Sequence, residues 1–265
     1  MKRTANQIAA PNEAQYHIGC KSGDIAKNII LVGDPQRAFR ISQQFEKIDV
    51  RRLHREYATY TGSYKGFPLS VMATGIGQGN MEIAVIEISQ VVSKSTIIRC
   101  GTSSGLQKNI QLGDMVISKT VHDLGNVSSY YKINSKNVKA NAKIEKALIR
   151  ACKELGLAFH AGKTASAPGF YGPQGRQIKG FPIKNQKLIS NLTKKKVLNL
   201  EMEVATLFSL ASLKKIPVGA VCSAIGNRVR NDFMKPIGIM TAENNSIQCV
   251  LKAFEILNRS DSGAK

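Results

Sequence analysis

The stretch Asn28-Ile-Ile-Leu-Val-Gly-Asp-Pro-Gln-Arg-Ala-Phe-Arg-Ile-Ser-Gln-Gln-Phe45 decides the fold class. Its apolar first part, residues 28–32, predicts a buried strand. Pro35 stands where the first turn of a helix accepts proline, so a helix is predicted over residues 35–45. The same alternation of short apolar strands and amphipathic helices continues along the chain, and it is typical of an α/β domain.

Outward from this stretch, apolar runs and periodicity predict the remaining elements. The expected strands cover residues 57–64, 67–74, 95–100, 115–120, 159–166, 197–200 and 218–225. The expected helices cover residues 81–92, 142–155, 204–213 and 239–257. Because no linker or repeat interrupts the pattern, we expect a single domain over residues 15–258. A flexible N-terminus (1–14) would precede it and a frayed C-terminal tail (259–265) would follow it.

Composition narrows the class of protein. The five cysteines among the 265 residues are odd in number and lack CxxC spacing, which argues against a disulfide framework or a zinc site. Residues 1–14 lack the apolar run of a signal peptide, and no stretch is long and apolar enough to span a membrane. The sequence therefore predicts a reduced, cytoplasmic protein.

The net charge of +20 suggests a nucleic-acid partner. The lysines, however, gather at predicted helix ends and turns, as in Lys194-Lys195-Lys196. No zinc finger, RGG tract or RNA-recognition motif accompanies them. A solvated surface explains these lysines better, and their positive field would raise the local concentration of an anionic substrate such as phosphate.

Residues 170–176, Phe-Tyr-Gly-Pro-Gln-Gly-Arg, combine an aromatic ring with two kinds of polar group on a Gly/Pro loop. The amide of Gln174 can donate and accept hydrogen bonds, whereas the guanidinium of Arg176 can only donate. Together they match the edge of uracil, with Gln174 at O2 and N3 and Arg176 at O4. Phe170 offers the aromatic face for the ring.

Two segments have the composition of an anion site. In residues 33–37, backbone N–H groups, a helix dipole and Arg37 favour negative charge, although a capped turn with a surface Arg would look the same. In Arg99-Cys100-Gly101-Thr102, a charged residue emerges from a buried strand. It needs an anionic ligand or, alternatively, a structural ion pair with a core Glu.

Glu201-Met202-Glu203 follows the apolar run 197–200 and opens the predicted helix that follows. Glutamates in a first helical turn are common because the helix dipole favours them. Two carboxylates beside a strand are equally suited to gripping the vicinal hydroxyls of a sugar. The sequence leaves both interpretations open.

From about His17 to Arg228, several short motifs in the same order resemble the nucleoside phosphorylase family, and most closely its uridine-cleaving members. The motifs are Gly33-Asp34-Pro35 with Arg37, His54-Arg55-Glu56, Thr74-Gly75-Ile76-Gly77, Arg99 with Gly101-Thr102, residues 170–176, Glu201-Met202-Glu203 and Asn227-Arg228. The resemblance implies a mixed, twisted central sheet, partly barrel-like and surrounded by helices. It also implies a cytoplasmic homo-oligomer, a dimer or a hexamer, that reversibly converts uridine and phosphate into uracil and ribose 1-phosphate in pyrimidine salvage.

The resemblance assigns roles to single residues. The phosphate-binding residues that it implies are Gly33, Arg37, Arg99 and Thr102, with Arg55 from a neighbouring subunit. The ribose-binding residues are Met202, Glu203 and, again from a neighbouring subunit, His17. The base-binding residues are Phe170, Gln174, Arg176, Ile225 and Arg228. No cofactor is implied, because phosphate is a co-substrate.

In the same family, a glutamate equivalent to Glu56 and the loop after Thr74-Gly75-Ile76-Gly77 hold a potassium ion between subunits. Here Gln78-Gly79-Asn80 stands in that loop, where bacterial relatives have Gly-Pro-Ser. A monovalent cation at Glu56, Ile76 and Asn80 is the corresponding expectation for this chain.

The absence of an acidic residue after one predicted strand bears on which base the protein prefers. Purine-cleaving members carry an Asp after the strand that corresponds to residues 218–223, where it protonates the base. This chain has Ala224-Ile225-Gly226-Asn227-Arg228 there, and Ile225 would pack on the base, which favours a pyrimidine. Nearby Asp232 keeps a purine nucleoside phosphorylase as an alternative. A non-catalytic protein that binds nucleosides or nucleic acid on the same fold is a further alternative.

Overall fold

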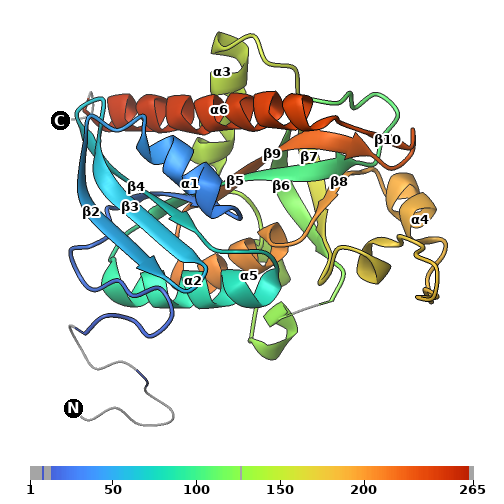
Figure 1. Cartoon of the computed structure of the whole chain (residues 1–265), viewed down its shortest axis with the longest axis horizontal. Helices are drawn as coiled ribbons and strands as arrows, with labels where there is room; N and C mark the ends of the chain where they lie inside the picture. Colours follow the sequence, from blue (N-terminus) through green and yellow to red (C-terminus); the bar gives the residue numbers. More distant parts are fainter. Residues whose placement is uncertain (1–7, 9–12, 126, 263–265) are drawn as a thin grey trace.

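The computed structural model describes Ile8 and residues 13–262 except Asn126 (Figure 1). Its strands are β1 (Asn28–Val32), β2 (Lys47–His54), β3 (Tyr57–Tyr64), β4 (Phe67–Ala73), β5 (Thr96–Gly105), β6 (Met115–Asp123), β7 (Phe159–Ser166), β8 (Val197–Glu201), β9 (Val218–Asn227) and β10 (Asp232–Phe233). Its helices are α1 (Pro35–Ser42), α2 (Gln78–Val91), α3 (Ala142–Glu154), α4 (Leu188–Lys194), α5 (Val204–Lys214) and α6 (Pro236–Ser262).

In the described chain, ten strands form one sheet in the order β10-β9-β6-β7-β8-β5-β1-β4-β3-β2. Strands β5 and β9 also pair with each other, so β5, β9, β6, β7 and β8 close into a small barrel. Strands β1, β4, β3 and β2 continue from β5 as an open extension with parallel and antiparallel pairs. The mixed, partly barrel-like sheet expected from the sequence is therefore confirmed.

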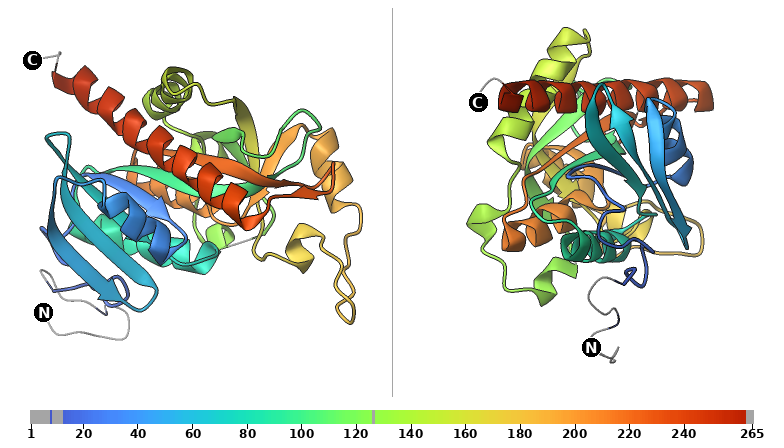
Figure 2. Two further views of the ribbon diagram at one scale, coloured as in Figure 1. Left: turned by 45° about the horizontal axis from the view of Figure 1, so that its top comes forward. Right: turned by 90° about the vertical axis from the view of Figure 1, so that its left-hand side faces the viewer.

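Helices cover both faces of this sheet (Figure 2). Successive residues of a strand point to opposite faces, and β1 shows the result. Ile30 and Val32 join the hydrophobic core under α1, α3 and α6, whereas Ile29 and Leu31 join the core under α2 and α5. Burial on both faces holds the strands in place, and the segments at their carboxyl ends remain to build a site.

Strand β5 extends five residues beyond its predicted end at Cys100. The added residues, Gly-Thr-Ser-Ser-Gly, have weak strand propensity, but β9 pairs with them in parallel, for example Thr102 with Ser223. Pairing with a neighbouring strand overrides intrinsic propensity here. Thr102 is consequently held by a strand and not by a loop.

The ends of several other elements differ from the prediction. Helix α1 ends at Ser42, three residues before its predicted end. Strand β2 is missed in the sequence because its side chains are mostly polar and it pairs only with β3 at the sheet edge. Helix α6 runs to Ser262, past its predicted end at residue 257, and Arg259 lies 3.9 Å from Glu255 one turn earlier. Residues 263–265, and 1–7 and 9–12 of the predicted flexible N-terminus, lie outside the described residues.

The five cysteines are buried free thiols. Within the described ranges, no helix has both the length and the apolar character needed to cross a membrane.

Candidate active site

A cavity of about 760 Å³ lies where β1, β5 and β9 end and where β8 leads into α5. Parallel strands deliver their carboxyl ends to one edge of a sheet, which brings together residues that are far apart in the sequence. Twelve of the sixteen residues named from the sequence line this cavity: Gly33, Arg37, Glu56, Ile76, Asn80, Arg99, Thr102, Phe170, Gln174, Met202, Glu203 and Ile225. His17, Arg55, Arg176 and Arg228 are not among its lining residues.

Arg37 lies in the first turn of α1, which Asp34 caps by accepting a hydrogen bond from the backbone of Gln36 at 2.9 Å. Arg37 is 5% exposed. Its Nη1 donates to the carbonyl of Cys100 at 3.2 Å and its Nη2 donates to Glu243 at 2.5 Å. Its Nε has no hydrogen-bond partner among the described residues. The turn is capped, as predicted, but the alternative of a surface Arg is wrong because the guanidinium is buried.

One carboxylate serves two guanidiniums at this end of the cavity. Glu243, on α6, accepts from Arg37 with one oxygen and from Arg40 with the other. Burial alone would raise the pKa of Glu243, but the two ion pairs outweigh burial and hold the pKa below its ordinary value. Because two positive groups share one negative group, this cluster has a net positive charge.

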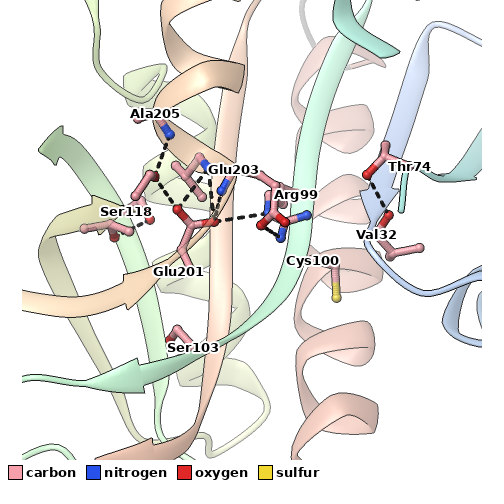
Figure 3. A network of polar contacts seen from close by, with 12 residues as sticks. Val32, Thr74, Arg99, Cys100, Ser103, Ser118, Glu201, Glu203 and Ala205 are labelled. Carbon is pink, nitrogen blue, oxygen red and sulfur yellow. Dashed lines mark hydrogen bonds and ion pairs between the residues drawn. The ribbon is translucent and has the colours of Figure 1, made fainter. Parts of the chain in front are cut away.

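Two carboxylates serve one guanidinium in the middle of the site (Figure 3). Arg99, on β5, donates through Nη2 to Glu203, and its Nε lies 3.5 Å from Oε2 of Glu201. In the part of the chain that the structure describes, Nε and Nη1 of Arg99 have no hydrogen-bond partner. Burial opposes the charge of Arg99, but Glu203 and then Glu201 outweigh burial and raise its pKa. The ion pair with a core Glu that the sequence left open is therefore present.

The two glutamates have different surroundings. Glu201 accepts from the backbone N–H groups of Glu203 and Val204, at 2.9 and 3.0 Å, and from the hydroxyl of Ser166, so it caps α5. Burial first, and the Glu203 carboxylate second, raise the pKa of Glu201 to about 7. Glu203 accepts from the backbone N–H of Gly77 at 2.7 Å as well as from the arginine. Of the two roles that the sequence left open, stabilising the start of a helix is therefore the role of Glu201, although α5 begins at Val204.

The segment after β7 carries a buried amide beside an exposed aromatic ring. Gln174 is 2% exposed and Phe170 is 45% exposed. The guanidinium of Arg176 stacks on the ring of Phe170, 3.8 Å from its centroid. Its Nη1 donates to the carbonyl of Phe170 at 2.6 Å and to Oε1 of Gln174 at 2.5 Å. In this arrangement, the Nε2 of Gln174 remains as the donor of the amide.

Arg176 and Arg228 hold this segment from outside the cavity. Arg228 donates to the backbone carbonyls of Gln174 and Gly175, at 2.8 and 3.3 Å. Burial first, and repulsion from Arg228 second, lower the pKa of Arg176 to about 10. Arg176 also lines a second cavity of about 830 Å³, whose walls come mostly from residues 171–188.

His17 and Arg55 lie near each other beside the end of β2 and do not line the 760 Å³ cavity of their own chain. The Nδ1 of His17 is 2.6 Å from a carboxylate oxygen of Glu87, and the carbonyl oxygen of His17 is 2.7 Å from Nδ1 of His54. Arg55 donates to the hydroxyl of Tyr16 at 3.3 Å, and its guanidinium lies 5.3 Å from the centre of that ring.

The cavity includes Phe233, to which the sequence assigns no role. Phe233 belongs to the two-residue strand β10, which pairs with the end of β9 and sets Phe233 opposite Gly226. A two-residue strand has no periodicity that could reveal it. The neighbouring Asp232 does not line the cavity and forms an ion pair with Arg230 at 2.7 Å.

Glu56 and Asn80 converge on one wall of the cavity. A Cβ added at Gly75 would lie 2.5 Å from Nδ2 of Asn80 and 3.1 Å from Cγ of Glu56. The side chains of Glu56 and Asn80 therefore meet beside the backbone of Gly75 on this wall.

Comparison with known proteins identifies the family. The family model described as the phosphorylase superfamily matches residues 27–259. This chain belongs to the phosphorylase superfamily. The match covers all the elements that surround the cavity, and the fold expected from the motifs is that of the superfamily.

Three similar proteins illustrate the range of the superfamily. The uridine phosphorylase of Thermococcus kodakarensis is 40% identical over 223 residues, which are 83% of this chain and 80% of the relative. The guanosine phosphorylase of Halorubrum lacusprofundi is 30% identical over 215 residues, which are 81% of this chain and 84% of the relative. The crystal structure of a Trypanosoma brucei nucleoside phosphorylase that shows uridine phosphorylase activity matches with a TM-score of 0.83. That match has 25% sequence identity and covers 92% of this chain and 98% of the other.

Proposed function

We propose that this chain is a uridine phosphorylase, which reversibly transfers the ribosyl group of uridine to phosphate and releases uracil, in pyrimidine salvage. One observation carries the proposal. A single cavity is lined by buried guanidiniums with unbonded N–H groups, by buried carboxylates and by a buried amide. These three kinds of group suit a phosphate, a sugar diol and the edge of a pyrimidine, respectively.

Phosphate binds at Gly33, Arg37, Arg99 and Thr102. The unbonded Nε of Arg37 and the unbonded Nη1 of Arg99 are buried donors that a phosphate would satisfy. Gly33 precedes the start of α1, where the helix dipole favours an anion. The hydroxyl of Thr102 adds a further donor beside them.

Ribose binds at Met202 and Glu203. The carboxylate of Glu203 has about four acceptor positions, and the structure shows two donors using them, Arg99 and the N–H of Gly77. The remaining positions accept the 2′ and 3′ hydroxyls of the sugar. Met202 supplies an apolar surface for the ribose ring.

Uracil binds between the segment after β7 and the end of β9. Gln174 recognises O2 and N3, while Phe170 and Ile225, which both line the cavity, pack on the ring. Arg176, whose Nη1 now bonds to Gln174, turns toward O4 of the base. Arg228 keeps the segment in place through its bonds to the backbone.

Each active site is completed by a neighbouring subunit, in a dimer or in a hexamer of dimers. His17 and Arg55 do not line their own cavity, and the exposed edge strand β2 carries Arg55 to the surface. In the neighbour, His17 reaches the ribose 5′-hydroxyl and Arg55 reaches the phosphate. Glu56, Ile76 and Asn80 hold a potassium ion at the same interface, and no other cofactor is needed.

The chemistry follows from the placement of charge. Cleavage of the glycosidic bond builds positive charge on the sugar and negative charge on the departing base. Phosphate and Glu203 stabilise the sugar, while Gln174 and Arg176 stabilise the base. Phosphate is itself the nucleophile, so the protein contributes alignment of two bound reactants and preorganised charge.

The main alternative is a purine nucleoside phosphorylase, and the relative that cleaves guanosine gives it weight. Such an enzyme needs an acid at N7 of the base. The nearest candidate from the sequence, Asp232, is paired with Arg230 and does not line the cavity, whereas the apolar Ile225 does. The cavity therefore favours a pyrimidine.

Release of free base from uridine and, separately, from inosine, each with and without phosphate, tests the proposal. We expect uracil release that depends on phosphate. Release from inosine alone would retain the phosphate site but assign a purine pocket. Salt-sensitive RNA binding without any base release would instead support a non-catalytic protein and give the +20 charge a role. We place the reaction in the cytoplasm, where the five free thiols stay reduced.

A further inference from the structure

We propose that Glu243 is a positioning residue for the phosphate site. It does not line the cavity, yet it holds Arg37 in the orientation that presents Nε to the anion. The inference deepens the proposed function, because it rests on phosphate being the ligand of Arg37. It adds a determinant of phosphate affinity on α6, 206 positions away in the sequence.

The geometry fixes the guanidinium at two of its three nitrogens. Nη1 of Arg37 donates to the carbonyl of Cys100 at 3.2 Å, and Nη2 donates to Glu243 at 2.5 Å. Two bonds at the two ends of a planar group define both its plane and its direction. The third nitrogen, Nε, is buried and has no hydrogen-bond partner in the described ranges of the chain, so it is the donor left for a ligand.

Charge explains why this position needs an acid. Without a carboxylate at Glu243, the guanidiniums of Arg37 and Arg40 would share one site with no counter-charge. Arg37 is 5% exposed and would leave the cavity wall for water rather than remain buried and unpaired. With Glu243 present, Arg37 stays buried and the cluster still has a net positive charge that attracts an anion.

The same turn of α6 also contacts the strand that carries Arg99. The hydroxyl of Ser246 donates to the backbone carbonyl of Glu243 at 2.8 Å and lies 3.3 Å from the thiol of Cys100, the residue after Arg99 on β5. Helix α6 therefore contacts both elements that carry an arginine of the site, and through Glu243 it sets the direction of the Arg37 side chain.

The test compares Glu243→Gln with Glu255→Gln. Glu255 is an acid on the same helix, but it is buried and pairs with Lys65 at 2.8 Å and with Tyr64 at 3.0 Å, away from the cavity. In Glu243→Gln we expect the KM for phosphate to rise about tenfold, comparable to the loss when an outer partner of a metal ligand is removed, while the KM for uridine is unchanged. In Glu255→Gln both constants should equal those of the wild type, although its thermal stability falls.

Calorimetric titration of each protein with inorganic phosphate alone separates this inference from the proposed function. If the wild type binds phosphate but does not cleave uridine, the proposed reaction is refuted. Weaker phosphate binding by Glu243→Gln than by the wild type would still support the positioning role in that case. Equal phosphate affinity in wild type and Glu243→Gln would overturn the inference, as would an equal loss in Glu255→Gln. A wild type that binds no phosphate would overturn both.

Discussion

Two ion clusters, one partly buried and one fully buried, meet at the cavity, and their charges are arranged in opposite ratios. In the first, Glu243 lies between Arg37 and Arg40. In the second, Arg99 lies between Glu201 and Glu203. The first cluster therefore has an excess of positive charge, and the second has an excess of negative charge once Glu201, whose pKa is raised to about 7, has lost its proton. A reaction in which phosphate attacks a sugar that becomes positive needs this polarity along one cavity.

The clusters also differ in where the counter-charge lies. Glu243 is outside the cavity, so Arg37 keeps its partner when a ligand enters. Glu203 lines the cavity, so it can contact Arg99 and a ligand at the same time. Substitutions in the second cluster should therefore affect both stability and chemistry, whereas substitutions in the first should affect mainly the binding of the anion.

The largest effect is expected for Arg99→Ala. It removes both carboxylate contacts of the guanidinium together with its proposed contact to phosphate, and it leaves Glu201 and Glu203 buried together without a positive partner. We expect phosphorolysis to fall by about 10³-fold or more. The free energy of unfolding should fall by about 3–5 kcal/mol, the usual cost of breaking a buried pair. Uracil release and urea unfolding measure the two losses, and near-normal turnover would refute the assignment of Arg99.

A smaller effect is expected for Glu203→Gln, which keeps the shape of the side chain but weakens acceptance of the ribose hydroxyls. We expect kcat/KM for uridine to fall by about 10²-fold. The loss should be smaller for 2′-deoxyuridine, because that substrate lacks one of the two hydroxyls. Steady-state kinetics with both substrates measures the ratio. An identical loss for both would mean that Glu203 acts only through Arg99 and does not contact the sugar.

Most residues of the cavity can be predicted from the sequence. The difference between the two ion clusters can be predicted only in part. Short motifs at strand ends predict Arg37, Arg99 and Gln174, because parallel strands bring their carboxyl ends together. Glu243 has no such signal. It lies on a 27-residue helix whose periodicity shows which face is buried but not which acid meets which arginine.

The structure also separates residues that the motifs group together. Phe170, Gln174 and Arg176 lie within seven residues, yet Arg176 stacks on the ring of Phe170 and lines a different cavity. His17 and Arg55 fall outside the cavity of their own chain. A single sequence cannot show which residues of a motif turn toward the ligand, toward the backbone or toward a second subunit, because tertiary packing decides this.

The smallest effect is a pH dependence with opposite sign in the two clusters. The pKa of Glu201 is raised from 4.5 to about 7, first by burial and then by Glu203, so the folded state holds a proton that the unfolded chain releases. Stability from this group therefore falls as the pH rises from 4.5 to about 7. The pKa of Glu243 is lowered despite burial, because Arg37 and Arg40 bind its charged form. The contribution of Glu243 to the free energy of unfolding is therefore present above pH 4.5 and is lost as the pH falls through the lowered pKa.

Urea unfolding of the wild type, Glu201→Gln and Glu243→Gln between pH 3 and pH 8 measures both slopes. Glu201→Gln should remove a decline of roughly 1 kcal/mol or more between pH 4.5 and pH 7, and Glu243→Gln should flatten the acid limb below pH 4.5. Because the slopes and not the absolute stabilities are compared, a general loss of stability in either variant does not obscure the result. Parallel curves for all three proteins would show that the two clusters are not differently charged, and the contrast between them would fail.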